Sequence, residues 1–107
     1  MNERVYICGA YSHGGKLGWL ARFRNYRKHR QIAKWLESQG YIACSPIVEM
    51  APADLLGLNL FGQELYMIAS HGLLRCCDKI HKIDKWYLSE NCQKEARWAK
   101  EWGIEDF

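Results

Sequence analysis

The stretch that decides the fold is Val5-Tyr6-Ile7-Cys8-Gly9, near the start of the chain. Four apolar, β-prone residues that end at a glycine predict a buried strand followed by a turn. The same signal returns at residues 41–44, where Pro46 marks the end of the strand and the start of a loop because it cannot donate to a ladder. Residues 79–83 alternate polar and apolar side chains, which predicts a third strand that is half buried or at an edge.

Helical periodicity fills the segments between these strands. Residues 22–39 predict an amphipathic helix that Gly40 ends as a left-handed cap. Residues 63–77 predict a second helix, and a third runs from Ser89, a good N-cap, to Trp102 before Gly103 ends it. Residues 10–18 form a loop with three glycines, and residues 50–59 are interpreted as a mobile lid.

This alternation predicts the fold class. Strands separated by helices imply a mostly parallel sheet with right-handed crossovers. We therefore expect an α/β fold, a small three-layer flavodoxin-like or Rossmann-like domain with a mostly parallel sheet of roughly four or five strands. The 107 residues, 49% of them hydrophobic, are expected to form one domain, 1–107. Ligands bind beyond the carboxyl ends of such strands, so the loops after Cys8, Cys44 and Ile83 are the expected walls of a site.

Composition favours a cytoplasmic protein with an anionic partner. The chain opens without a charged segment followed by a long apolar run, so we expect no signal peptide and no membrane span. Five cysteines, with Cys76 and Cys77 adjacent, favour reduced thiols over a disulfide framework. The net charge of +3 is uneven, because the first third is rich in cations, which favours an anionic partner there. These cations are Lys16, Arg22, Arg24, Arg27, Lys28, Arg30 and Lys34.

Glu95 is the most informative residue of the last helix. Glu90 and Glu101 each have a lysine or arginine four residues away, which explains both as surface residues. Glu95 instead shares the packed face of the helix, where a partly desolvated carboxylate without an intrahelical cation has a raised pKa and is a candidate catalytic group. The alternative is a glutamate at the margin of the apolar stripe that reaches water or a cation from another element. The face of Glu95 also carries Trp98, Ala99 and Trp102.

Motifs over nearly the whole chain resemble one family. The spacing Trp86-x-x-Ser89-x-Asn91-Cys92-x-x-Glu95-x-x-x-Ala99-x-x-x-Gly103-Ile104 is similar to Gly-Trp-x-x-Ser-x-Gly-Ala-x-x-Glu-x-x-x-Ala-x-x-x-Gly. The opening Val5-Tyr6-Ile7-Cys8-Gly9-Ala10-Tyr11-Ser12 is similar to Tyr-Ile-Ala-Gly-Pro-Tyr-Ser. Asn25, Gln39-Gly40-Tyr41, Ser45-Pro46-Ile47 and Leu73-Leu74-Arg75-Cys76-Cys77-Asp78 fall at matching spacings. Both patterns are those of the nucleoside 2-deoxyribosyltransferase-like superfamily, in its small phage and bacterial members, which the chain therefore resembles.

The resemblance implies that Glu95 is a nucleophile that cleaves an N-glycosidic bond. Such a reaction passes through an oxocarbenium-like state that a carboxylate can stabilise or attack. Water as acceptor would make the protein a hydrolase, and a second base would make it a (deoxy)ribosyltransferase. The implied substrate is a (deoxy)nucleoside 5′-monophosphate, with no cofactor or metal, and the implied assembly is a homodimer through the second helix. The implied catalytic residues are Glu95 and Tyr6, and the implied substrate-binding residues are Gly9, Tyr11, Ser12, Arg24, Asn25, Ser45, Pro46, Ile47, Trp86, Ser89 and Asn91.

Three departures from the pattern keep a second function open. Lys85 and Asn91 stand where glycine is usual, and Ser70 stands where an aspartate is usual. The loss of this acid fits a catalytically silent module that holds a nucleotide in the same pocket. Binding of nucleic acid through the basic first helix is the third and least favoured reading, because a charge run on a helix is usually a solvated face.

Metal binding and cysteine catalysis are weaker readings. The histidines and cysteines lack paired CxxC or HxxxH spacing, so we expect no metal site. Cys92 lies near a helix N-terminus that lowers thiol pKa values, but no acid or histidine is placed to orient it, which favours a packed residue. The metal ligands considered are His71, Cys76, Cys77, His81 and Cys92.

Overall fold

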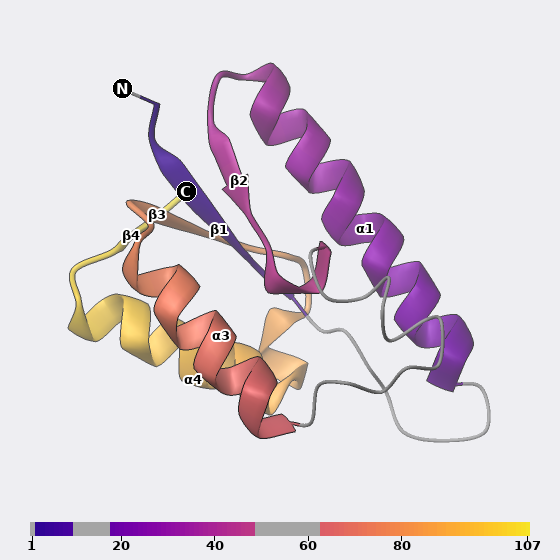
Figure 1. Cartoon of the computed structure of the whole chain (residues 1–107). Helices are drawn as coiled ribbons and strands as arrows, with labels where there is room; N and C mark the ends of the chain where they lie inside the picture. The colour runs from indigo at the N-terminus through magenta and orange to yellow at the C-terminus, as the bar shows by residue number, and fades with distance from the viewer. Residues whose placement is uncertain (1, 10–17, 49–62) are drawn as a thin grey trace.

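The computed structural model describes residues 2–9, 18–48 and 63–107, which form an α/β domain around a four-stranded, all-parallel sheet (Figure 1). The strands are β1 (Arg4–Cys8), β2 (Ile42–Cys44), β3 (Lys79–Lys82) and β4 (Glu105–Asp106). Their order is β2-β1-β3-β4, which matches the first four strands of a flavodoxin-like sheet. The expected fold class is confirmed.

Helices cover both faces of the sheet and make three layers. The helix α1 (Gly18–Ser38) lies on one face, and α3 (Gln63–Arg75) and α4 (Glu90–Glu101) lie on the other (Figure 1). The short 3-10 helix η1 (Trp86–Leu88) connects β3 to α4, and residues 46–48 are helical after β2. Among the described residues, none of the helices has the length and apolar character needed to cross a membrane.

The central strand β1 separates two hydrophobic clusters. Val5 and Ile7 join the cluster on the α1 side, which includes Leu36. Tyr6 and Cys8 join the cluster on the side of α3 and α4. Successive side chains of a strand point to opposite faces, so an inner strand that is buried on both sides reads as a continuous apolar run. This is why residues 5–8 were predicted as a buried strand.

The third strand lies inside the sheet. It pairs with β1 on one side and β4 on the other, so its placement at an edge is wrong, whereas its half-buried character is confirmed. Ile80 is buried, while Lys79, His81 and Lys82 are half buried. The true edge is β4, two exposed acidic residues that carry no strand signal in the sequence.

The segment after β2 corrects another prediction. Pro46 begins a helical turn instead of a loop, and Ser45 is its N-cap, with Oγ accepting from the backbone N of Val48 at 3.3 Å. Gly40 adopts a φ of 89°, which confirms the predicted left-handed cap, and Gly103, which follows the last helix as predicted, adopts a φ of 71°. The lid predicted over 50–59 and most of the loop 10–18 lie outside the described residues.

Candidate functional site

Glu95 lies on the inner face of α4, and 1% of its surface is exposed. The helix begins after Ser89, whose hydroxyl accepts from the backbone N of Cys92 at 3.4 Å. The buried residues of α4 are Cys92, Glu95 and Ala99, spaced by three and four positions. That spacing is one face of a helix, so the predicted position of Glu95 on the packed face is confirmed.

The carboxylate of Glu95 meets the carboxyl end of β1. The thiol of Cys8 donates to Glu95 Oε2 at 3.2 Å. The hydroxyls of Tyr6, on the same face of β1, and of Ser70, on α3, lie near enough to stabilise the charged form of this carboxyl. The other oxygen, Oε1, is buried and has no hydrogen-bond partner among the described residues.

Burial controls the ionisation of this carboxyl. Desolvation raises the pKa of Glu95 to about 7, and the Cys8 thiol and the nearby hydroxyls of Tyr6 and Ser70 offset only part of that effect. An aspartate at position 70 would instead add a second negative charge to the same enclosure. With serine there, Glu95 is the one acidic residue of the site within the part of the chain that the structure describes, with a pKa suited to work near neutral pH.

Two thiols complete the site. Cys8 Sγ lies 3.6 Å from the carbonyl oxygen of Cys92. The ligand atoms of Cys8, Cys92 and Glu95 all lie within 4.8 Å of one another, and we call these three residues the thiol–carboxyl cluster. The pKa of Cys92 is lowered, chiefly by the Cys8 thiol, whereas the hydrogen bond to Cys92, burial and the Glu95 charge raise that of Cys8.

The cluster occupies a topologically special place. Cys8 is the last residue of β1, and β1 lies between β2 and β3. The strand order reverses at this point, and crevices at such points are where open parallel sheets bind their ligands. The loop after Cys8 was predicted to form a wall of the site. Beyond Gly9, its residues 10–17 lie outside the described residues.

A second polar pair lies under α1. His29, 1% exposed, places Nδ1 at 3.1 Å from Ser45 Oγ. A Cβ on Gly9 would lie 2.6 Å from Ile83 Cδ1 and 3.0 Å from His29 Nε2. Close packing therefore requires glycine at position 9, and Ser45 has a capping role, independently of any contact with substrate.

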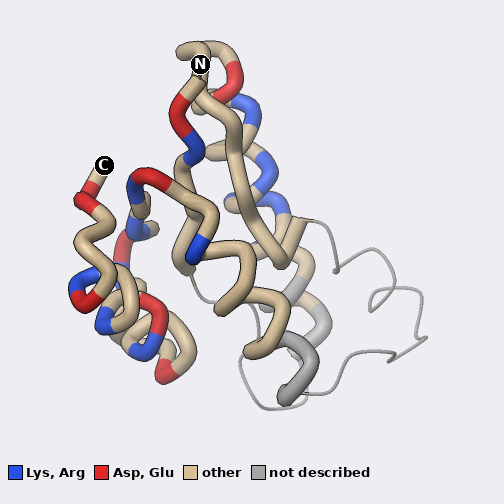
Figure 2. The backbone as a smooth tube through the Cα atoms, turned by 60° about the vertical axis from the view of Figure 1, so that its left-hand side comes forward, with Lys and Arg blue, Asp and Glu red and all other residues tan. Residues whose placement is uncertain are grey.

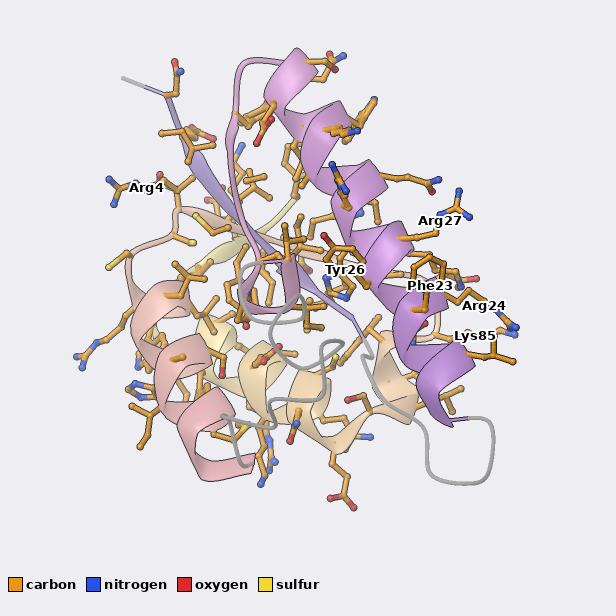
Figure 3. All side chains as sticks on the ribbon, turned by 45° about the vertical axis from the view of Figure 1, so that its right-hand side comes forward. Arg4, Phe23, Arg24, Tyr26, Arg27 and Lys85 are labelled. Atoms are coloured by element: carbon orange, nitrogen blue, oxygen red, sulfur yellow. The ribbon has the colours of Figure 1, made fainter. Side chains whose placement is uncertain are left out.

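The predicted site residues do not all converge on Glu95. The structure brings Tyr6 next to it and places Ser89 and Asn91 at the start of the same helix. Arg24 is exposed on α1 and, with Arg27, extends away from the sheet (Figure 3). α1 covers the face of the sheet opposite α4.

The remaining predicted residues are mostly packed. Pro46 and Ile47 are buried, and Asn25 is half buried in α1. Trp86 packs against the core cluster and has the Lys82 ammonium 4.8 Å from its ring centroid. Tyr11 and Ser12 lie outside the described residues, so their roles stay predictions.

A surface hollow lies elsewhere on α4. Its volume is about 730 Å³, and Trp86, Gln93, Arg97 and Lys100 are among its lining residues, while Glu95 is not. Trp86 thus packs inward against the core and also borders this hollow.

Sequence reasoning missed Cys8 as a member of the site. The signal was present, because Cys8 follows Tyr6 by two positions on a strand, and Cys92 precedes Glu95 by three positions on a helix. The sequence alone does not bring these two pairs together, since 84 positions separate the cysteines. The histidines considered as metal ligands lie elsewhere, with His71 packed against Trp98 and Trp102.

Fold and site together define a parallel α/β domain with a buried carboxyl at its switch point. Residues 3–105 match the family described as Domain of unknown function (DUF4406), and the chain belongs to that family. The comparisons with curated proteins and with solved structures gave no match.

Proposed function

We propose that the protein cleaves the N-glycosidic bond of a (deoxy)nucleoside 5′-monophosphate, with Glu95 as the nucleophile. The observation that carries the proposal is the Glu95 carboxyl, 1% exposed, beside Cys8 and Tyr6 at the switch point of a parallel sheet. A desolvated carboxylate stabilises or attacks an oxocarbenium-like centre more strongly than one in water. The resemblance to nucleoside 2-deoxyribosyltransferase-like proteins supports the same role.

The surroundings of Glu95 suggest how a nucleotide would sit. The N-terminus of α4, with Ser89 and the backbone that follows it, offers donors for a 5′-phosphate. The Tyr6 hydroxyl, beside the carboxyl, would hold the Glu95 oxygens in position for attack on the anomeric carbon. Water or a second base would then resolve the glycosyl intermediate, and the acceptor would decide between hydrolysis and transfer.

The test is release of free base from a panel of nucleoside and deoxynucleoside 5′-monophosphates, read by chromatography, with the matching nucleosides as a second panel. We expect release from at least one monophosphate, faster than from its nucleoside. Glu95→Gln should lower the rate at least about a hundredfold, because the amide keeps the shape and loses the charge. The rate should rise with pH through about 7, as Glu95 ionises.

Glu101→Gln is the matched control, since Glu101 is an exposed glutamate on the same helix. It should turn over at the parental rate. Glu95→Gln that folds normally and keeps the parental rate would show that Glu95 is not the nucleophile. A panel in which monophosphates bind but no base is released would favour the silent nucleotide-binding module.

Nucleic-acid binding rests on the charge of α1. Basic residues follow this helix, whereas α4 carries both signs of charge (Figure 2). Arg24, Arg27, Lys28 and Lys34 are exposed, as solvated lysines and arginines usually are. Steeply salt-dependent binding of oligonucleotides would be the result that favours this function.

We also propose a homodimer that pairs through α3, in the cytoplasm. Between Met67 and Leu74, α3 carries no lysine, arginine, aspartate or glutamate (Figure 2), and Ile68 is 69% exposed. A large exposed apolar residue on an uncharged helix face fits an isologous two-fold contact. The five cysteines are all free thiols, which fits a reducing compartment.

A further inference from the structure

We propose that the thiol–carboxyl cluster of Cys8, Cys92 and Glu95 is a binding site for a thiophilic divalent cation, Zn²⁺ above all. This inference goes beyond the proposed function and does not rest on it. The three side chains come from two elements, β1 and α4, and all three are buried. Among the described residues, no other group of three histidine, cysteine or acidic side chains converges in this way.

The distances fit a zinc coordination shell after a small contraction. With bond lengths of about 2.3 Å to sulfur and about 2.0 Å to oxygen, neighbouring ligands of a tetrahedral zinc lie about 3.3–3.8 Å apart. Cys8 Sγ already lies 3.2 Å from Glu95 Oε2, and all three ligand atoms lie within 4.8 Å of one another. Water can fill the fourth position, as it does in zinc sites with three protein ligands.

The cluster also has unmet electrostatic demand. A buried carboxyl whose Oε1 has no partner among the described residues is costly to ionise, and the Cys8 thiol offers one hydrogen to one oxygen. A divalent cation reverses this situation, because it stabilises the thiolates and the carboxylate together. Binding releases the thiol protons of Cys8 and Cys92, and the Glu95 proton wherever that carboxyl is protonated, to solvent and changes no oxidation state.

The two elements bring both thiols to the same carboxyl. Cys8 is the last residue of β1, and Cys92 lies on the buried face of α4, three residues before Glu95. The Ser89 hydroxyl, which lowers the pKa of Cys92, would act as an outer-shell partner of that ligand.

The test starts from the reduced, chelator-treated full chain, titrated anaerobically with Co²⁺ alone. We expect thiolate-to-cobalt charge-transfer absorption and tetrahedral visible bands that saturate at one ion per chain and disappear when Zn²⁺ is added. X-ray absorption of the zinc-loaded wild type should show two sulfur scatterers at about 2.3 Å. This second measurement needs no variant and so does not depend on how a variant folds.

The variants assign the ligands. Cys8→Ala and Cys92→Ala should each abolish the charge-transfer signal, and Glu95→Gln should weaken binding at least about tenfold. The matched control is Cys77→Ala. Cys77 is a free, buried thiol of the same core whose neighbour is the Cys44 thiol, so this variant should bind the metal like the parent.

Absence of thiolate-to-cobalt absorption in the wild type would overturn the proposal. So would a signal that survives Cys8→Ala and Cys92→Ala but is lost in Cys77→Ala. Neither result would touch the proposed glycosidic activity, because no nucleotide is present in these measurements. If both proposals hold, metal loading occupies Glu95 and should stop base release.

Discussion

The carboxyl of Glu95 holds its proton more tightly in the folded chain than in the unfolded chain, because folding removes it from water. Its pKa rises from an ordinary value of 4.5 to about 7. Below about pH 4.5 the carboxyl is protonated in both states and costs nothing. Between about pH 4.5 and 7 the unfolded chain ionises it while the folded chain keeps the proton, so the fold loses stability until the loss is complete above about pH 7. The full cost above that pH is about 3 kcal/mol, at about 1.4 kcal/mol for each pKa unit.

This cost predicts a pH-dependent difference between the parent and Glu95→Gln. The free energy of unfolding of the parent, relative to that of the variant, should fall by about 3 kcal/mol from about pH 4.5 to about pH 8. Urea unfolding at several pH values measures it. Glu101→Gln, which removes an exposed carboxyl, should track the parent throughout. A constant difference between parent and Glu95→Gln would mean that Glu95 titrates normally in the fold.

At the scale of elements, the turn between β3 and α4 stores backbone strain. Lys85 precedes η1 with φ 62° and ψ 23°, in the left-handed region where a side chain is disfavoured. Glycine is usual at this position of the pattern that the chain resembles, and the backbone conformation supplies the physical reason. A residue with a Cβ in that region costs on the order of 1 kcal/mol or more.

Relief of this strain is the second stability prediction. Lys85→Gly should be more stable than Lys85→Ala by about 1 kcal/mol, since both variants lose the ammonium and only glycine accepts the left-handed backbone freely. The midpoints of chemical denaturation of the two variants give the difference directly. Equal midpoints would indicate that the turn relaxes without cost.

The helices and strands were largely predictable from the sequence, whereas which of them lie next to one another in space was not. A helix packed on one face leaves an apolar period of 3.6 residues, which predicted α4. A strand packed on both faces leaves a continuous apolar run, which predicted β1. The two-residue β4 and the inner position of β3 depend on which strands pair, and no local pattern encodes that. Glu95 was found by its helix face, whereas Cys8 required knowledge of which face of β1 meets α4.

At the scale of the whole molecule, the described surface includes a stretch of α3, residues 67–74, that carries no lysine, arginine, aspartate or glutamate. Ile68 is 69% exposed and Gly72 is exposed on α3, so this face offers an apolar side chain and a point of close approach. By contrast, α1 and α4 carry many charges (Figure 2). A two-fold contact brings the same patch of both subunits together. A charge added to this patch therefore lies near the same charge on the partner and is repelled by it.

That geometry makes Ile68→Asp the deciding variant for the homodimer. Light scattering at micromolar concentration should give the parent twice the 12.5 kDa mass of the chain. Two facing aspartates and the loss of two apolar contacts should cost at least about 2 kcal/mol, enough to weaken association more than about tenfold and give the mass of a monomer. Leu88→Asp is the matched control, because Leu88 is 67% exposed but lies on η1, and this variant should remain dimeric. A monomeric parent would refute the dimer, and a dimer lost only in Leu88→Asp would move the contact from α3 to the turn before α4.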